Sequence, residues 1–244
     1  MQTLFISDLH LSPVRPQKLD LFKRLLRGHA RDAAGLYILG DLFDNFWVGN
    51  DDQTPPNPDI LEELLAFSEA NKNLFIIRGN RDLMLDMTFK NVAGCTLLPD
   101  LHVVELEGEK VLLSHGDIFC SKDIGYQRYR RFMETSFTRT VFPRLPYALR
   151  IKLSHGLRPL IKKSSIKKAK AIIDVEQTTV EQSMIDHGVQ HLIHGHTHRP
   201  DVHQFQLNDK PATRTVLSDW YVNDGVLVCE NGERTMMRIE EYLA

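Results

Sequence analysis

Short apolar runs alternate with helical patterns along the first 120 residues. Apolar residues recur at helical spacing over Lys18–Arg31 and Asp59–Ala70. Between and after these stretches lie runs that read as strands, at Thr3–Ser7, Leu36–Leu39, Leu74–Ile77, Val103–Leu106 and Val111–Ser114. Strands that alternate with helices are typical of α/β folds with a parallel or mixed sheet. A loop is expected at Asp51–Pro58, because its three prolines disfavour regular structure.

The pattern changes between Lys122 and Lys170, where basic and aromatic residues recur at helical spacing. Three prolines divide this stretch into short helices, at Pro143, Pro146 and Pro159. A longer helix is predicted from about Ser165 to His187, with Gly188 as its C-cap. Further strands are expected at His191–His194, Val216–Ser218 and Val226–Cys229. We therefore expect a core formed by residues 1–121 and 171–244, interrupted by a helical insert at 122–170 that covers the sheet as a lid.

The distribution of charge sets this insert apart from the core. The 244 residues are 42% hydrophobic and 25% charged, a composition that excludes disordered and fibrous classes. The formal net charge is only −2. However, residues 122–170 contain fourteen Lys and Arg against two acids, a charge of +12, which leaves −14 for the rest of the chain. A basic insert on an acidic body predicts an anionic partner.

The cysteines and the apolar runs indicate the compartment. Cys95, Cys120 and Cys229 are widely spaced and form no C-x-x-C pair, so we expect buried free thiols in a reducing environment. No apolar run approaches the roughly 20 residues that span a bilayer. The opening MQTLFISDLHL has no basic leader, and Asp8 interrupts its apolar run. The sequence therefore predicts a protein of the cytoplasm.

Polar residues with metal-binding chemistry follow five of the apolar runs. The carboxyl ends of parallel strands form the crevice where α/β proteins bind ligands, so these residues are expected to converge. Several stand beside a glycine, which lets the backbone turn sharply. They are Asp8 and His10 after TLFI, Asp41 after YILG, Asn80 and Arg81 after FIIRG, His115 after VLLS, and His194, His196 and His198 in HLIHGHTH.

The donor atoms in this set are carboxylates, imidazoles and one amide, with no thiolate. Such nitrogen and oxygen ligands suit Mn²⁺, Fe²⁺, Zn²⁺ or Mg²⁺. Two metals about 3.5–4 Å apart need a bridging carboxylate and a few ligands each, and the set is large enough for that. A lone Asp-x-His is more often a turn or capping element, and a lone histidine is often structural. Five such blocks in order, each at a strand end, predict a dinuclear metal centre.

At this point the chain resembles a known family. The order D-x-H, G-D, G-N, H and G-H-x-H is similar to that of the calcineurin-like metallophosphoesterases, over residues 1–120 and 188–230. The resemblance implies their four-layer α/β sandwich, with two mixed β-sheets face to face and helices outside. It also implies the ligand sets: Asp8, His10 and His198 for one metal, Asn80, His115 and His196 for the other, and Asp41 as the bridge.

One departure from the family pattern indicates a particular branch of the family. Most members have a catalytic histidine after G-N, whereas this chain has Arg81 followed by Asp82. Arginine there, together with YILGDLF, Trp47, HGD and IHGHTHRP, is similar to the branch that acts in lipid A biosynthesis. The resemblance implies two divalent ions, with Mn²⁺ as the expected metal, and a cytoplasmic protein associated peripherally with the inner membrane. The resemblance implies water attack on the α-phosphorus of UDP-2,3-diacylglucosamine, which yields UMP and 2,3-diacylglucosamine 1-phosphate.

The same resemblance implies individual roles. Asp82 and Asp117 are expected to orient loops and ligand imidazoles. Ile161 stands where the branch has a serine, so its substrate contact is not carried over to this chain. Catalytic roles fall on Arg81, Asp41 and His196, and substrate contacts on Asn80, Arg81, Asp123, Ser165, Lys168 and His196.

The insert favours an amphiphilic partner over a nucleic acid. From Phe142 to Ile161, Leu, Ile and Tyr alternate with Arg and Lys, a pattern that suits an anionic membrane surface or a lipid groove. In most proteins such a pattern is an ordinary helix pair with a solvated basic face, but the neighbouring phosphoesterase site favours the lipid interpretation here. Two other functions remain open, a nuclease or phosphodiesterase whose insert grips a phosphate backbone, and a metal-free scaffold. A nucleic-acid groove would favour exposed aromatics over Leu and Ile, and a scaffold would be expected to lose ligands.

Overall fold

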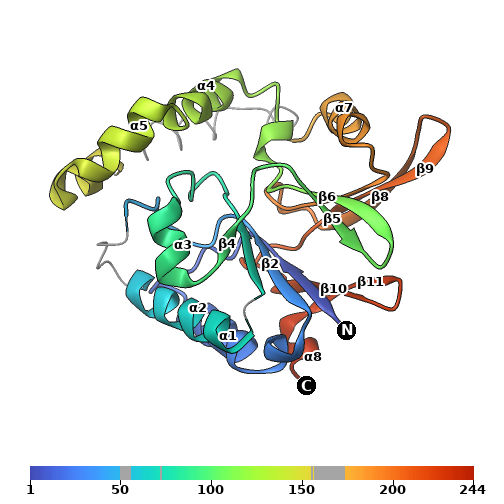
Figure 1. Ribbon diagram of the computed structural model, residues 1–244, viewed down its shortest axis with the longest axis horizontal. Helices are drawn as coiled ribbons and strands as arrows, with labels where there is room; N and C mark the ends of the chain where they lie inside the picture. Colours follow the sequence, from blue (N-terminus) through green and yellow to red (C-terminus); the bar gives the residue numbers. More distant parts are fainter. Residues whose placement is uncertain (50–55, 72, 155, 157–173) are drawn as a thin grey trace.

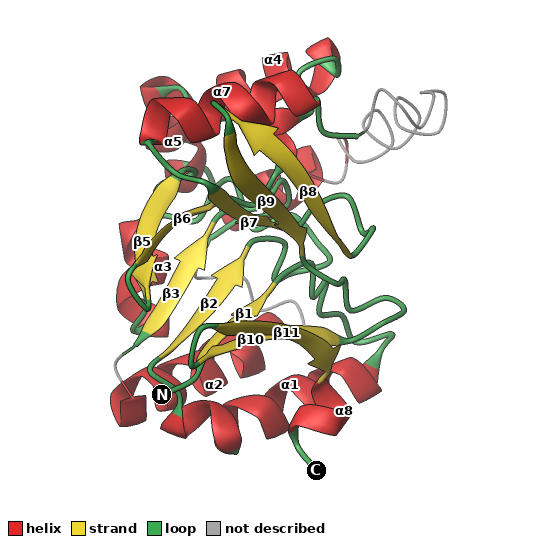
Figure 2. Ribbon diagram, turned by 90° about the vertical axis from the view of Figure 1, so that its right-hand side faces the viewer, coloured by secondary structure: helices red, strands yellow, loops and turns green. Residues whose placement is uncertain are grey.

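Two mixed β-sheets pack face to face, and helices cover their outer faces (Figures 1 and 2). The computed structural model describes residues 1–49, 56–71, 73–154, 156 and 174–244. In the described chain the first sheet has the order β11-β10-β1-β2-β3-β4, with β1 to β4 parallel and β10 and β11 antiparallel. Its strands are β1 Thr3–Ile6, β2 Gly35–Leu39, β3 Leu74–Ile77, β4 Thr96–Leu97, β10 Gly225–Glu230 and β11 Glu233–Arg238.

The second sheet has the order β5-β6-β7-β9-β8 in the described residues. Strands β6, β7 and β9 run parallel, while β5 and β8 pair antiparallel at the two edges. The strands are β5 His102–Leu106, β6 Glu109–Leu113, β7 His191–His194, β8 Asp201–Leu207 and β9 Lys210–Val216. The two mixed sheets with outer helices confirm the predicted four-layer α/β sandwich.

Alternation along the buried strands explains the layers. In β1, Leu4 and Ile6 face the helices of the first sheet, whereas Phe5 faces the second sheet. All three are fully buried, so the strand reads as a continuous apolar run. The inter-sheet core takes Leu39 and Ile77 from one side and Leu113 and Ile193 from the other.

The outer helices complete the sandwich. Helices α1, α2 and α8 lie along the first sheet, and α7 packs on the second through the buried Val180 and Met184 (Figure 2). Gly188 ends α7 in the left-handed conformation, as predicted for a C-cap. The bounds in the core are α1 Pro16–Arg27, α2 Asn57–Asn71, α3 Met87–Ala93, α7 Gln177–His187 and α8 Ile239–Tyr242, with short 3₁₀ helices η1 His29–Asp32 and η2 Asp117–Phe119.

Three hairpins join neighbouring strands in the described chain, and two of them contain a strand that the apolar pattern did not predict. Each has a two-residue loop in which both residues have positive φ, the conformation that matches the twist of paired strands. Strands β8 and β11 were missed because they are largely exposed, with polar residues on the outer face. The loops are Glu107-Gly108, Asn208-Asp209 and Asn231-Gly232.

Three sequence predictions are corrected at element boundaries. The helix predicted from Ser165 does not run continuously to His187, because residues 174–176 are non-helical. There the Glu176 N–H bonds to the carbonyl of Phe119 instead of an earlier turn. Helix α2 includes Pro58, which fits a first helical turn because proline lacks only an N–H that is unpaired there. The strand predicted at Val216–Ser218 instead ends at Val216.

The described part of the insert consists of short helices, as its prolines predict. They are α4 Ile124–Met133, α5 Ser136–Val141, η3 Phe142–Arg144 and a helical stretch at residues 147–154. In Figure 1, α4 and α5 extend along one side of the molecule, above α3. Whether the insert is a separate unit with the predicted boundaries stays a prediction.

A buried arginine fastens the first insert helix to the core. The side chain of Arg130 on α4 is 8% exposed, and its nitrogens lie 2.9 Å from carboxylate oxygens of Asp100, Asp117 and Glu134. Asp117 also accepts a hydrogen bond from the hydroxyl of Tyr126. Because Asp100 and Asp117 belong to the core, this network fixes the base of α4 against the two sheets.

Two further predictions concern the cysteines and the membrane. All three cysteines are buried free thiols, as predicted, and burial raises the pKa of Cys120 to about 12. Within the described residues, no helix is both long enough and apolar enough to cross a bilayer.

Candidate metal centre

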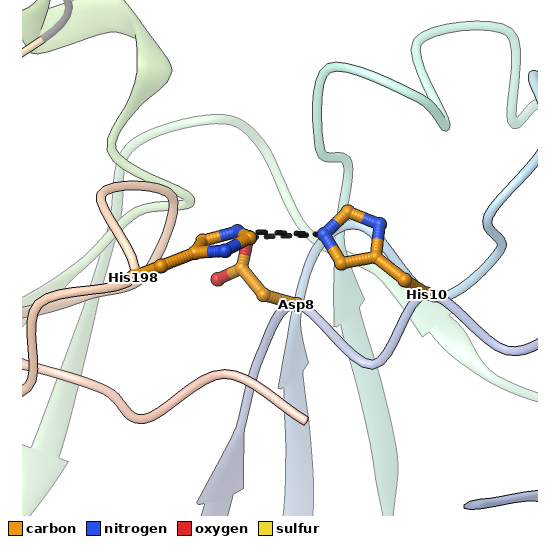
Figure 3. A group of neighbouring side chains, drawn as sticks. All are labelled: Asp8, His10 and His198. Carbon is orange, nitrogen blue, oxygen red and sulfur yellow. Dashed lines mark hydrogen bonds and ion pairs between the residues drawn. The ribbon is translucent and has the colours of Figure 1, made fainter. Parts of the chain in front are cut away.

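The predicted ligands come together where the parallel strands end. Asp8 follows β1, Asp41 follows β2, and Asn80 follows β3 in the first sheet. His115 follows β6, and both His196 and His198 follow β7 in the second. Since parallel strands end at the same edge of a sheet, two packed sheets bring all these residues to one crevice. Figure 3 shows three of them meeting there from two chain segments.

The backbone at the site is held in an unusual conformation. Asp8, His10, Asp41, His196 and His198 all have positive φ, between 45° and 70°. This left-handed conformation costs a non-glycine residue roughly 1–2 kcal/mol, although Asp and His adopt it more readily than branched residues. Five such residues in one crevice show that the surrounding sheets impose the geometry. Strain gathered in this way is typical of functional sites.

Two motif glycines allow the strand-end loops to touch. A Cβ on Gly79 would lie 2.2 Å from the backbone nitrogen of Asp41. A Cβ on Gly195 would lie 2.0 Å from the hydroxyl of Ser7 and 2.3 Å from a carboxylate oxygen of Asp8. Atoms cannot approach so closely, so any larger residue would push the loops apart.

The first predicted ligand set forms a tight group. His198 Nε2 donates to Asp8 Oδ1 at 3.1 Å and lies 3.4 Å from His10 Nε2 (Figure 3). The donor atoms of these three residues all lie within 4.8 Å of one another. The second Asp8 oxygen accepts from the Ser7 hydroxyl and from the backbone N–H of His196. These hydrogen bonds fix the orientation of the Asp8 carboxylate. They also join the loop of Asp8 and His10 to the loop of His196 and His198.

The second predicted set also comes together. Asn80 Oδ1 lies 3.2 Å from His115 Nε2 and 3.0 Å from His196 Nδ1. His115 is fully buried, and its Nδ1 donates to the carbonyl of Leu39 at 2.8 Å. That bond fixes the tautomer that leaves Nε2 free to bind a cation, as in most metal-binding histidines.

Asp41 lies between the two sets. Its Oδ2 is 3.6 Å from His10 Nε2, and its Oδ1 is 3.8 Å from His115 Nε2. One oxygen thus faces each histidine, the arrangement that a bridging carboxylate needs. The backbone N–H of Arg81 donates to Oδ1 at 2.9 Å and orients the carboxylate.

The residue after Asn80 reaches the same crevice. The Arg81 guanidinium lies 3.8 Å from Asp41 Oδ2 and 3.5 Å from Asp44 Oδ1, and it also donates to the Asp44 carbonyl. Its neighbour Asp82 is buried and accepts from the backbone N–H of Leu42, so it orients the loop that carries Asp41, as predicted.

The predicted substrate residues of the insert are only partly described. Asp123 is buried at the N-cap of α4, where its carboxylate accepts from the N–H of Tyr126 at 2.9 Å. Ser165, Lys168 and Ile161 lie outside the described residues. Sequence reasoning missed Arg15, Asp44 and Tyr221, which line the crevice from other loops, and no motif marks them.

Known proteins that resemble this chain in sequence identify its family. The model of the calcineurin-like phosphoesterase family matches residues 1–200. The chain belongs to the calcineurin-like phosphoesterases. The chain is 43% identical to the UDP-2,3-diacylglucosamine hydrolase of Aeromonas hydrophila, over 99% of each chain. It is 44% identical to the enzyme of the same name from Aliivibrio fischeri, over 93% of this chain and 94% of that one. Among solved structures, a phosphoesterase from E. coli aligns over 99% of this chain and 94% of that chain, at 17% identity and a TM-score of 0.49.

The protonation of this phosphoesterase site follows from burial and charge. Burial lowers the pKa of His10 to about 2 and of His196 to about 4, so both imidazoles are neutral. Burial raises the pKa of Asp41 to about 6. Burial also opposes the charging of His115, but Asp41, Asp8 and Asp117 outweigh it and raise that pKa to about 9. Without cations, the crevice holds a buried imidazolium among carboxylates.

These residues fit divalent cations. The carboxylate, imidazole and amide donors are those that hard and borderline metals prefer. Two groups of donor atoms that could each hold an ion, Asp8–His10–His198 and Asp8–Asp41–His115, lie side by side and share Asp8. Cations at these places would replace the proton on His115 and compensate the buried carboxylates.

Metal affinity is expected to depend on pH. His115, with a pKa of about 9, is protonated at neutral pH and must lose that proton before Nε2 can bind a cation. The Mn²⁺ affinity should therefore rise roughly 10-fold per unit between about pH 6.5 and 8.5. Isothermal titration calorimetry at several pH values measures this. A His115→Asn variant, which has no such proton, should show a flatter dependence. Equal affinity across the range in the parent protein would contradict the assignment.

Proposed function

We propose that this chain hydrolyses the diphosphate of UDP-2,3-diacylglucosamine, to give UMP and 2,3-diacylglucosamine 1-phosphate in lipid A biosynthesis. The proposal rests on one juxtaposition, an apolar hollow that shares Asn80 and Arg81 with the metal crevice. A lipid with a diphosphate head group needs a polar site for its phosphates and an apolar surface for its acyl chains, and the two must lie within the length of one molecule. The names of the relatives, which are similar over nearly their whole length, support the same substrate.

The hollow lies between the core and the insert. Its apolar lining includes Trp47 and Met84 of the core with Tyr129, Met133 and Phe142 of the insert. A second hollow adjoins it and shares Trp47, Met84 and Phe142. Pockets lined by aromatic and aliphatic side chains favour hydrocarbon. We therefore propose that the insert covers the acyl chains.

The metal crevice supplies the chemistry of the head group. Two divalent ions, which we propose to be Mn²⁺, would supply a water of lowered pKa and positive charge at the phosphoryl oxygens when bound. We propose that Asp8, His10 and His198 hold one ion, that Asn80, His115 and His196 hold the other, and that Asp41 bridges them. In the reaction the oxygen of water bonds to the α-phosphorus. The bond to the bridging oxygen breaks, and that oxygen leaves with the sugar phosphate.

The residues of this chain then bind and orient the diphosphate. Arg81, with 26% of its side chain exposed, is within reach of solvent and can bond two phosphate oxygens at once. His196, which is neutral, can hold a ligand position or donate a hydrogen bond to the substrate. Asp123, Ser165 and Lys168 are proposed to contact the nucleotide sugar.

An amphiphilic substrate implies contact with a membrane. Ile124, Phe132 and Phe137 on the insert helices are 60%, 60% and 70% exposed, and Arg128 and Arg131 lie beside them, exposed. Exposed aromatics among cations are suited to the anionic surface of a bilayer. We propose peripheral association with the inner face of the cytoplasmic membrane through this face of the insert.

The reaction itself can be tested with labelled water. Purified protein with Mn²⁺ should release UMP from UDP-2,3-diacylglucosamine, and in H₂¹⁸O the label should appear in UMP, because the α-phosphorus is attacked. Asp41→Ala should lower kcat by about 10³-fold or more, since it removes the proposed bridge. Cleavage of bis-p-nitrophenyl phosphate or DNA without any cleavage of the lipid nucleotide would overturn the proposal.

Filling the hollow should weaken lipid binding selectively. Met84→Trp is expected to displace two or three methylenes of an acyl chain, about 2 kcal/mol, and to raise KM roughly 30-fold. Turnover of bis-p-nitrophenyl phosphate, which has no acyl chain, should be unchanged. Met84→Leu keeps the volume and serves as the control. An equal loss with both substrates would place the acyl chains elsewhere.

Membrane association can be tested by sedimentation with vesicles of phosphatidylglycerol and phosphatidylcholine. Replacing Phe132 and Phe137 together by serine should lower the partition coefficient by about 10-fold or more, because two inserted rings are lost. Val202→Ser, at a 53% exposed apolar position on β8, is the matched control. Undiminished binding of the double variant would show that another surface contacts lipid.

A further inference from the structure

Tyr221 packs against His10 and His198, which belong to the ligand set predicted for the first metal; we call this set the first half of the centre. It belongs to the loop between β9 and β10, and 41% of the residue is exposed. Its ring centroid is 4.8 Å from that of His10 and 5.7 Å from that of His198. Both separations lie in the range of favourable ring contacts. The two imidazoles that meet in Figure 3 therefore share one aromatic neighbour.

The loop holds Tyr221 in a fixed place. The backbone N–H of the preceding Trp220 donates to the carbonyl of Asp8 at 3.1 Å. The Trp220 indole is fully buried and donates to the carbonyl of Gly225. The N–H of Tyr221 itself donates to the Asp219 carboxylate at 2.7 Å. The position of the ring is thus tied to the strand end that carries Asp8.

Two charged residues fasten the ring from the outside. The guanidinium of Arg15 stacks over the ring at 4.0 Å from its centroid, a cation–π contact, and also donates to the backbone carbonyl of His10. The hydroxyl of Tyr221 donates to Asp44 Oδ1 at 2.9 Å, and Arg15 lies 3.7 Å from the same oxygen. Tyr221, Arg15 and Asp44 together form what we call the tyrosine clamp.

The two halves of the centre differ in how their imidazoles are oriented. In the second half, His115 Nδ1 donates to a backbone carbonyl, the usual device for fixing a metal-binding histidine. In the first half, His10 Nδ1 is buried and has no hydrogen-bond partner among the described residues. Because no hydrogen bond at Nδ1 fixes the plane of the His10 ring, that plane depends on packing. The ring of Tyr221 packs against His10 at a shorter centroid distance than the ring of His198 does, 4.8 Å against 5.3 Å.

We propose that Tyr221 is a positioning residue, which sets the imidazole planes of His10 and His198 and so raises the affinity of that one metal site. Arg15 and Asp44 keep the ring in place. The inference rests on the metal centre proposed above. Loss of a group that orients a ligand typically lowers metal affinity by about 10–100-fold, and the clamp should affect only the ion held by His10 and His198.

The test is to measure Mn²⁺ stoichiometry and both dissociation constants by calorimetry, with electron paramagnetic resonance to distinguish paired from single ions. Tyr221→Ala should weaken one ion by about 10–100-fold and leave the other unchanged, so that a single-ion signal replaces the coupled one. Tyr221→Phe keeps the ring and should stay within about 3-fold of the parent. Val222→Ala, at the adjacent position that is 73% exposed, is the control.

A double variant tests whether Tyr221 affects metal affinity through His10. In a His10→Ala background the first site is already lost, so adding Tyr221→Ala should not change the affinity of the remaining ion. Thermal unfolding of the metal-free proteins measures any general loss of stability. Equal weakening of both ions, no change in either, or an undiminished effect in the His10→Ala background would overturn the clamp alone. A parent protein that binds fewer than two ions would overturn the metal centre and the clamp together.

Discussion

The site depends on how closely the loops after five parallel strands approach one another. At Gly79 and Gly195 there is no room for a side chain, and Asp8, Asp41 and three histidines adopt the left-handed conformation. At roughly 1–2 kcal/mol each, these five residues cost a sizeable share of the 5–15 kcal/mol by which a domain is stable. The two packed sheets must supply that stability. The position of the proposed ligands is therefore a property of the whole fold and not of the loops alone.

The same crevice joins two surfaces of opposite chemistry. Buried carboxylates and imidazoles occupy one side, and an apolar hollow between core and insert adjoins it through Asn80 and Arg81. The ion network around Arg130 holds α4 on the core, so the wall of the hollow has a fixed base. The −14 of the core includes the carboxylates of this crevice, and the described helices of the insert, which carry part of its +12, line the hollow beside it. An amphiphilic anion fits such a site better than nucleic acid does.

The sequence predicted those strands that form apolar runs and those site residues that directly follow them. Each proposed ligand follows a buried strand within a few residues, so the fold and the crevice could be inferred together. Strands β8 and β11 were missed because exposed edge strands lack an apolar run, although Asn231-Gly232 is a recognised hairpin signal. The tyrosine clamp could not be predicted, because its three residues come from unrelated loops and meet only through tertiary packing. The start of α7 was misplaced because a hydrogen bond to Phe119 replaces a helical turn.

The most direct test of this account is a crystal structure with Mn²⁺, recorded at wavelengths on both sides of the manganese absorption edge. The account predicts two anomalous peaks about 3.5–4 Å apart. One should lie among Asp8, His10 and His198, the other among Asn80, His115 and His196, with an Asp41 oxygen between them. A single peak, or two peaks that Asp41 does not join, would contradict the dinuclear centre.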